Sequence, residues 1–203
     1  MNTNLWAFER EARKGGYFQI AGVDEAGRGP LAGPVVSAAV VLPQSFDIEG
    51  VDDSKKLSPK KRIELYPRIL DAAQAVGVGI VDAATIDRIN ILQATLQSMV
   101  KAVADLSVSP DYLLVDGIFE VSLPLPQKTI TKGDSRSISI AAASVIAKVT
   151  RDRLMVKYDD LYPQYGFAKH KGYPTQAHKE AVRQFGCSPI HRKSFKGVKE
   201  TLV

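Results

Sequence analysis

The stretch YFQIAGVDEAGRGPLAGPVVSAAVVL, residues 17–42, carries the clearest signals of the fold. Its first part, residues 17–23, is short and apolar and stops at the acidic pair Asp24 and Glu25, a pattern that is typical of a buried strand. Glycines and prolines then mark a turn, and residues 35–42, which are rich in Val and Ala, predict a second strand. The stretch therefore predicts a hairpin with two acids at the end of its first strand.

The rest of the chain predicts helices and strands in alternation. A strand is expected at 76–81, a buried strand at 112–115 and a shorter one at 128–131, and helices are expected at 58–74, 85–106, 138–161 and 174–185. Ser58 and Pro59 suit the start of the first of these helices, and Gly186 suits the end of the last. This order predicts an α/β fold, a mixed sheet flanked by helices with a small C-terminal helical segment. We expect one domain, residues 1–203, with 162–203 as a helical and loop extension packed on it.

Composition narrows the class of protein. Lys and Arg number 27 against 22 Asp and Glu, which gives a net charge of +5, and this mild excess suits a polyanionic partner without proving one. A single cysteine, Cys187, excludes a disulfide within the chain and a thiolate metal cluster. Residues 1–16 lack the apolar core of a signal peptide, and the apolar run 138–149 is too short to span a bilayer. We therefore expect a cytoplasmic protein with no membrane partner.

Acidic residues recur where the predicted strands end. Asp24, Glu25 and Asp116 close two apolar strands, and Asp134 follows a third by a few residues. Since ligands collect at the carboxyl ends of strands in such sheets, these acids are candidates for one site. Four carboxylates in one place would repel each other unless a cation joined them, and oxygen-only ligation favours Mg²⁺ or Mn²⁺. The alternative is that each acid simply ends a strand and meets solvent or an arginine.

Several motifs, taken in order, resemble those of bacterial ribonuclease HII. They are DEAGRGP at 24–30, DSKKL at 53–57, VDG at 115–117, KGDS at 132–135, AAASVIAKVTRD at 141–152, and YGF and HKGYPT within 165–175. The resemblance covers residues 22 to 197. It implies the ribonuclease H-like fold and an endonuclease that cuts the RNA strand of RNA–DNA hybrids. It also implies incision of duplex DNA on the 5′ side of a single embedded ribonucleotide, which leaves a 3′-hydroxyl and a 5′-phosphate and begins ribonucleotide excision repair.

The resemblance also implies roles for individual residues. It places a two-metal site on Asp24, Glu25, Asp116 and Asp134, which would be both the metal ligands and the catalytic residues. It assigns the turn Gly27, Arg28 and Gly29 to contact with the ribose 2′-hydroxyl, the group that distinguishes RNA from DNA. Tyr173 matches the tyrosine that packs beside the nucleotide next to the cut. The alternatives are a plain structural turn and an aromatic ring folded onto the core.

Other candidate substrate contacts are less distinctive. Ser54 and Lys55 are expected to contact phosphates, although a lysine is more often a solvated surface charge. Ser144, Lys148 and His170 are the remaining candidates, with Lys148 expected either near the carboxylates or on an exposed helix face. Two further polar residues are expected to have structural roles. Asp152 is expected to be an ion-pairing residue, with Arg151 or Arg153 as a neighbour, and His178 is expected to lie on the surface of its helix. RNA–DNA hybrid and ribonucleotide-containing duplex DNA are the expected partners, bound by a monomer.

Two other classes of function stay open at this point. The first is a ribonuclease HIII, a relative that usually carries an extra N-terminal substrate-binding domain, whereas only about 20 residues precede Asp24 here. The second is a nucleic-acid binder without catalysis on the same fold. That binder would be expected to lack at least one of the four acids, and all four are present.

Overall fold

A computed structural model describes residues 5–46, 50 and 57–201 of the chain. Its centre is a five-stranded sheet in the order β3-β2-β1-β4-β5. The hairpin partners β1 and β2 are antiparallel, as are β2 and β3, whereas β4 runs parallel to both β1 and β5. The strands are β1 Ile20–Ala26, β2 Val35–Val41, β3 Ala75–Val81, β4 Tyr112–Asp116 and β5 Gln127–Ile130. The predicted mixed sheet is confirmed.

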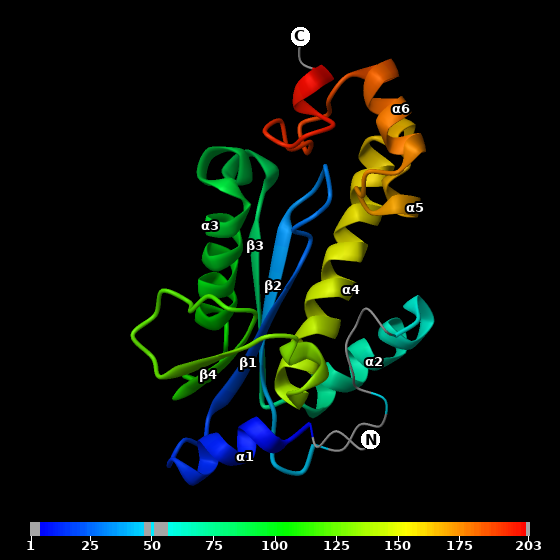
Figure 1. The fold of residues 1–203 in the computed structure, drawn as a ribbon. Coiled ribbons are helices and arrows are strands. Elements are labelled where there is room, and N and C mark those ends of the chain that lie inside the picture. The colour runs from blue at the N-terminus through cyan, green and yellow to red at the C-terminus, as the bar shows by residue number, and fades with distance from the viewer. Residues whose placement is uncertain (1–4, 47–49, 51–56, 202–203) are drawn as a thin grey trace.

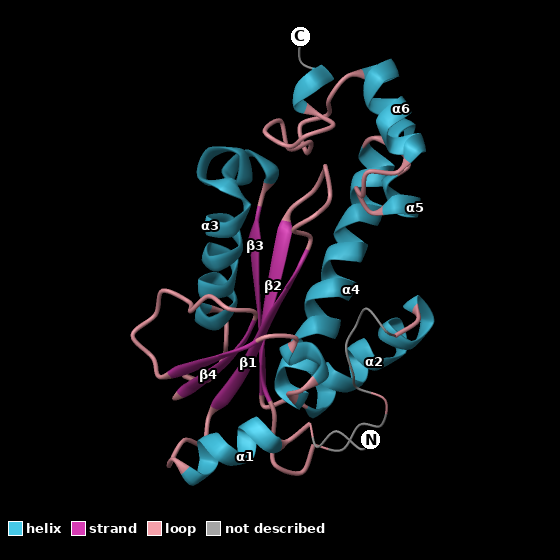
Figure 2. Cartoon of the chain, viewed as in Figure 1, coloured by secondary structure: helices cyan, strands magenta, loops and turns pink. Residues whose placement is uncertain are grey.

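Helices cover both faces of this sheet (Figures 1 and 2). On one face, α3 (Ala83–Ala104) packs against apolar side chains of β1 and β2. On the other face, α4 (Ile138–Leu161) packs against β2 together with α2 (Pro59–Ala72). None of the described helices is long and apolar enough to cross a membrane.

Local signals explain where the helices begin. Ser58 accepts a hydrogen bond from the Lys61 N–H (3.2 Å) at the start of α2, and Ser137 does the same for the Ile140 N–H (3.3 Å) at the start of α4. The helix α3 starts two residues earlier than predicted because Asp82 caps it, and it is kinked at Asn90, which has a positive φ of 67°. The described helix α1 (Ala7–Lys14) was not predicted from the sequence.

A C-terminal segment packs at the far end of α4 (Figure 1). It contains two short 3₁₀ turns, η2 (Pro163–Tyr165) and η3 (Lys199–Thr201), together with α5 (Phe167–His170) and α6 (Gln176–Phe185). Phe167 and Val182 of this segment share a buried cluster with Met155 of α4. The predicted last helix is therefore present but starts at Gln176, and the loop expected at 165–173 holds one helical turn.

The first strand lies unusually close to α4. Side chains alternate along β1, so Ala21 and Val23 join the core beneath α3 while Gly22 and Asp24 face α4. A Cβ atom added to Gly22 would lie 2.1 Å from the carbonyl carbon of Ser139. The missing side chain therefore lets the start of α4 approach the strand that carries Asp24.

We predict that Gly22→Ala destabilises the protein by about 2 kcal/mol or more, because the new methyl group meets backbone that cannot rotate away. Urea unfolding followed by circular dichroism measures this change. Gly29→Ala is the matched control, since the atom nearest to a Cβ there, Cε1 of Tyr173, is 4.0 Å away among the described residues. Equal stability of the two variants would contradict the close approach of α4 to β1.

Candidate active site

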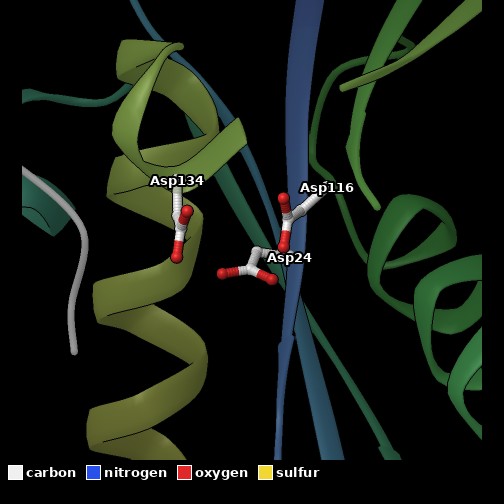
Figure 3. A group of neighbouring side chains, drawn as sticks. All are labelled: Asp24, Asp116 and Asp134. Carbon is white, nitrogen blue, oxygen red and sulfur yellow. The ribbon is translucent and has the colours of Figure 1, made fainter. Parts of the chain in front are cut away.

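Three aspartates from three different elements meet beside the first strand (Figure 3). Asp24 lies on β1, Asp116 is the last residue of β4, and Asp134 lies in the 3₁₀ turn η1 (Gly133–Ser135). One carboxylate oxygen from each lies within 4.8 Å of the others. The sequence correctly predicted this gathering, but Asp24 does not follow the end of its strand as expected. The ladder between β1 and β2 continues through Ala26, so Asp24 is within the strand.

Backbone contacts hold two of these carboxylates in place. Asp116 Oδ1 accepts a hydrogen bond from the Gly133 N–H (2.7 Å), which ties the end of β4 to η1. A Cβ on Gly133 would lie 2.6 Å from Ile140 Cδ1, so η1 packs closely against the side chain of Ile140 on α4. Asp24 Oδ1 accepts from the Glu25 N–H (2.7 Å). The aspartates are thus positioned by main-chain groups, whose geometry the fold fixes.

The electrostatics of the cluster favour a cation. Asp24 is only 2% exposed, and burial, together with the charges of Glu25 and Asp116, raises its pKa well above the usual range. The Ser144 hydroxyl and the Glu25 N–H oppose that rise. Asp24 Oδ2 is buried and has no hydrogen-bond partner within the described part of the chain. A divalent ion with oxygen ligands would supply both the missing partner and the missing positive charge.

Glu25 lies apart from the three aspartates. Because neighbouring side chains on a strand point to opposite faces, it is directed to the α3 side of β1. Its Oε1 lies 3.5 Å from Arg28 Nη1, and it lines a pocket with Asp116 and Leu92. The fourth predicted acid is therefore next to the cluster, across β1, and only Asp116 borders both places.

The predicted substrate-reading residues gather beyond the end of β1. The turn after this strand contains Gly27, which has a positive φ of 103°. A Cβ on Gly29 would lie 4.0 Å from Cε1 of Tyr173, so the ring of Tyr173 stands close to the turn. Tyr173 is 43% exposed, which contradicts the alternative that the ring is folded onto the core.

Lys148 and Ser144 lie on the same helix, α4, but contact different residues. Ser144 is buried beside Asp24, whereas Lys148 Nζ lies 5.9 Å from the ring centroid of Tyr173. Lys148 also forms an ion pair with Asp152 (2.7 Å), so Asp152 is an ion-pairing residue as expected, but its partner is a lysine and not a neighbouring arginine. An i, i+4 lysine on the same helix is a nearer partner.

The remaining candidates are placed differently. Ser54 and Lys55 lie outside the described residues. His170 Nε2 lies 2.8 Å from the Tyr165 carbonyl oxygen, and its Nδ1 accepts from the Gly172 N–H (3.2 Å), so both ring nitrogens hold the loop together. Its contact with substrate stays a prediction.

His178 is not on the surface as predicted, because it is fully buried. Its Nδ1 lies 2.9 Å from the carbonyl oxygen of Tyr173, and its Nε2 lies 3.0 Å from Nε2 of His191. Burial lowers the pKa of both histidines to about 4, so both are neutral at pH 7. Within the C-terminal segment, the pair links His191 to the backbone of Tyr173, and the contact between the two histidines spans 13 residues, which helical periodicity could not reveal.

Comparison with known proteins agrees with this geometry. The profile of the family described as Ribonuclease HII matches residues 21–198. The chain belongs to the ribonuclease HII family. Ribonucleases HII from Geobacter metallireducens and Geobacter sulfurreducens are 62% and 63% identical to it, over 97% and 98% of this chain and 92% and 91% of theirs. Membership of the ribonuclease HII family makes the chain a ribonuclease and supports the HII alternative over HIII.

Solved structures show the same fold. The ribonuclease H2 of Pyrococcus horikoshii OT3 superposes with a TM-score of 0.75 at 30% identity, covering 90% of this chain and 96% of that one. The RNase HII of Archaeoglobus fulgidus, solved in complex with PCNA, gives 0.73 at 26% identity, covering 88% of this chain and 95% of that one. A Bst-RNase HIII in complex with Mn²⁺ gives 0.70 at 20% identity, covering 92% of this chain and 70% of that one, and shows the fold alone.

Two buried residues of this ribonuclease HII site, Arg151 and Arg192, were not predicted from the sequence. They are 1% and 0% exposed and bind the backbone of the turn that follows β1. An arginine is normally a surface residue, and nothing in the local pattern distinguishes these two from their neighbours. A buried arginine that binds backbone carbonyls is visible only in three dimensions.

We predict that Asp24→Asn abolishes cleavage and raises the melting temperature in a chelator, because the buried charge and its repulsion from Asp116 are removed. The gain is expected to be about 1 kcal/mol. The upward shift in melting temperature that Mg²⁺ causes in the wild type should disappear. Differential scanning fluorimetry with and without Mg²⁺ measures both effects.

Asp152→Asn is the control for that experiment, because Asp152 is an acid that pairs with Lys148 outside the cluster. It should retain the Mg²⁺-induced shift. If Asp24→Asn cleaved as fast as the wild type in Mg²⁺, the assignment of Asp24 to the active site would be contradicted.

Proposed function

We propose that this ribonuclease cuts the RNA strand of RNA–DNA hybrids and incises duplex DNA on the 5′ side of a single embedded ribonucleotide. One observation carries the proposal: a cluster of three aspartates lies beside β1, the strand that leads into a glycine turn faced by the exposed ring of Tyr173. The cluster suits phosphodiester hydrolysis, and the turn and ring suit recognition of a sugar. The expected products are a 3′-hydroxyl and a 5′-phosphate.

The donor set fits two hard cations, Mg²⁺ or Mn²⁺. Asp24, Asp116 and Asp134 would hold one, and Glu25 with Asp116 would hold the other across β1. When bound, such ions activate water and stabilise the charge that develops on the leaving oxygen. The chain supplies the rigid placement of these carboxylates. The unpartnered oxygen of Asp24 supports the first position.

The protein's own groups would select and orient the nucleic acid. The turn of Gly27, Arg28 and Gly29 would contact the ribose 2′-hydroxyl, and the ring of Tyr173 would pack on the sugar of the adjoining nucleotide. Lys148, which lies over that ring, would add positive charge where the phosphates pass.

Four further residues complete the proposed substrate site. Ser144 would steady Asp24, and His170 would act by holding the shape of its loop. Ser54 and Lys55 remain predicted phosphate contacts. The four acids belong to one chain, which supports a monomer as the working unit.

The test is cleavage of a DNA duplex that contains one ribonucleotide, with 5′ and 3′ labels on that strand. We expect a single cut on the 5′ side of the ribonucleotide in Mg²⁺ or Mn²⁺ and no cut in a chelator. Asp134→Asn is the inactive control. A cut on the 3′ side, or equal cutting of an all-DNA duplex, would contradict the proposal.

We predict that Tyr173→Ala lowers the rate of cutting at a single ribonucleotide by about tenfold to a hundredfold while it weakens binding much less. The ring is expected to add about 1–3 kcal/mol by stacking, gained mainly where the sugar must be aligned. Single-turnover rates and binding affinities measured on the same duplex separate the two effects. Tyr173→Phe keeps the ring and should stay close to wild type. If cutting rate and binding affinity fell by the same factor, the proposed role of Tyr173 in recognising the ribonucleotide would be contradicted.

A further inference from the structure

Two buried arginines hold the turn after β1 by its carbonyl groups. Arg192 donates from Nε to the carbonyl oxygen of Gly33 (3.0 Å) and from Nη1 to that of Arg28 (3.0 Å), and Nη2 donates to that of Gly27. The residue is fully buried, and burial lowers its pKa to about 9, so it stays charged at pH 7. No carboxylate pairs with it among the described residues. Burying a cation without a partner anion costs desolvation free energy, and here three carbonyl dipoles stabilise the charge.

Arg151, on α4, holds the same loop from the other side. It donates from Nε to the carbonyl oxygen of Pro34 (2.9 Å), from Nη2 to that of Ala32 (3.0 Å) and from Nη1 to that of Lys171 (3.0 Å). A Cβ on Gly27 would lie 2.1 Å from Nε of Arg151. The turn and this guanidinium therefore pack so closely that no side chain fits between them.

The contacts of Arg192 decide which way two peptide groups face. The described chain contains no cis peptide bond, and in a trans peptide the N–H points opposite to the C=O. With the carbonyls of Gly27 and Arg28 turned toward Arg192, the N–H groups of Arg28 and Gly29 point away from it. Neither N–H donates to any group in the described part of the chain. The ring of Tyr173 lies close to Gly29, since a Cβ atom added to Gly29 would be 4.0 Å from its Cε1.

We propose that Arg192, supported by Arg151, is a positioning residue that fixes these two N–H groups as donors to the sugar of the substrate. The proposal rests on the function proposed above, in which the turn meets a ribose 2′-hydroxyl. Arg192 itself touches no substrate, because it is fully buried behind the turn and three of its donor N–H groups bind carbonyl oxygens. Its effect is to prevent the peptides from flipping, so the donors are in place before the substrate arrives.

The experiment compares binding of two duplexes of identical sequence, one all DNA and one with a single ribonucleotide, in Ca²⁺ in place of Mg²⁺ to limit cleavage. In Arg192→Met, we expect the preference for the ribonucleotide to fall about tenfold, the factor that one lost hydrogen bond represents. Affinity for the all-DNA duplex should stay within about twofold. A purely structural role would weaken both affinities by the same factor, and that result would overturn the proposal.

Two further variants keep the experiment decisive. Arg192→Lys keeps the charge but loses the planar guanidinium group, so we expect a partial loss of the preference for the ribonucleotide-containing duplex. If Arg192→Met does not fold, Arg192→Lys tests the proposal. Val103→Ala removes buried volume from α3, in a cluster that contains no residue of the loop after β1, and should lower stability while preserving the preference. Full preference in folded Arg192→Lys and Arg192→Met would overturn this proposal alone. A wild type that binds both duplexes equally would overturn the proposed function as well.

Discussion

Mutual repulsion among closely placed carboxylates is the constraint on which the rest of the structure depends. Asp24, Asp116 and Asp134 are held within 4.8 Å of one another although the pKa of Asp24 is raised by burial and by its neighbours. Holding them there requires rigid surroundings. The parallel pairing of β1 with β4 and the close approach of α4 at Gly22 provide that rigidity. The site therefore stores an electrostatic cost that a bound cation would relieve.

A second electrostatic cost, this time from buried positive charge, lies behind the turn after β1. Arg151 and Arg192 are buried without a carboxylate partner among the described residues, and their donors go to main-chain carbonyls instead. A carboxylate at this place would neutralise the guanidinium groups and add negative charge near the path of a polyanion. Carbonyl partners hold the loop equally well while they leave the positive charge in place.

Much of the acid cluster could be predicted from the sequence, because apolar strands and the acids near their ends are local patterns. Asp116 follows three buried residues of β4, and the pattern located it without knowledge of the fold. The burial of His178 and the roles of Arg151 and Arg192 could not be predicted in the same way. Their partners lie 13, 117 and 165 residues away in the chain, and such contacts exist only in the folded protein.

The alternation of β1 separates two acids that the sequence presents as one pair. Asp24 faces α4 and Glu25 faces α3, so their side chains cannot approach one ion from the same side of the strand. Asp116, at the end of the neighbouring strand, borders both positions because no further strand residue shields it. The two cation positions proposed above, one on each side of β1, rest on this alternation. The same geometry leaves the turn after β1 free for the proposed contact with a ribose, because Asp24 and Glu25 precede the turn on β1.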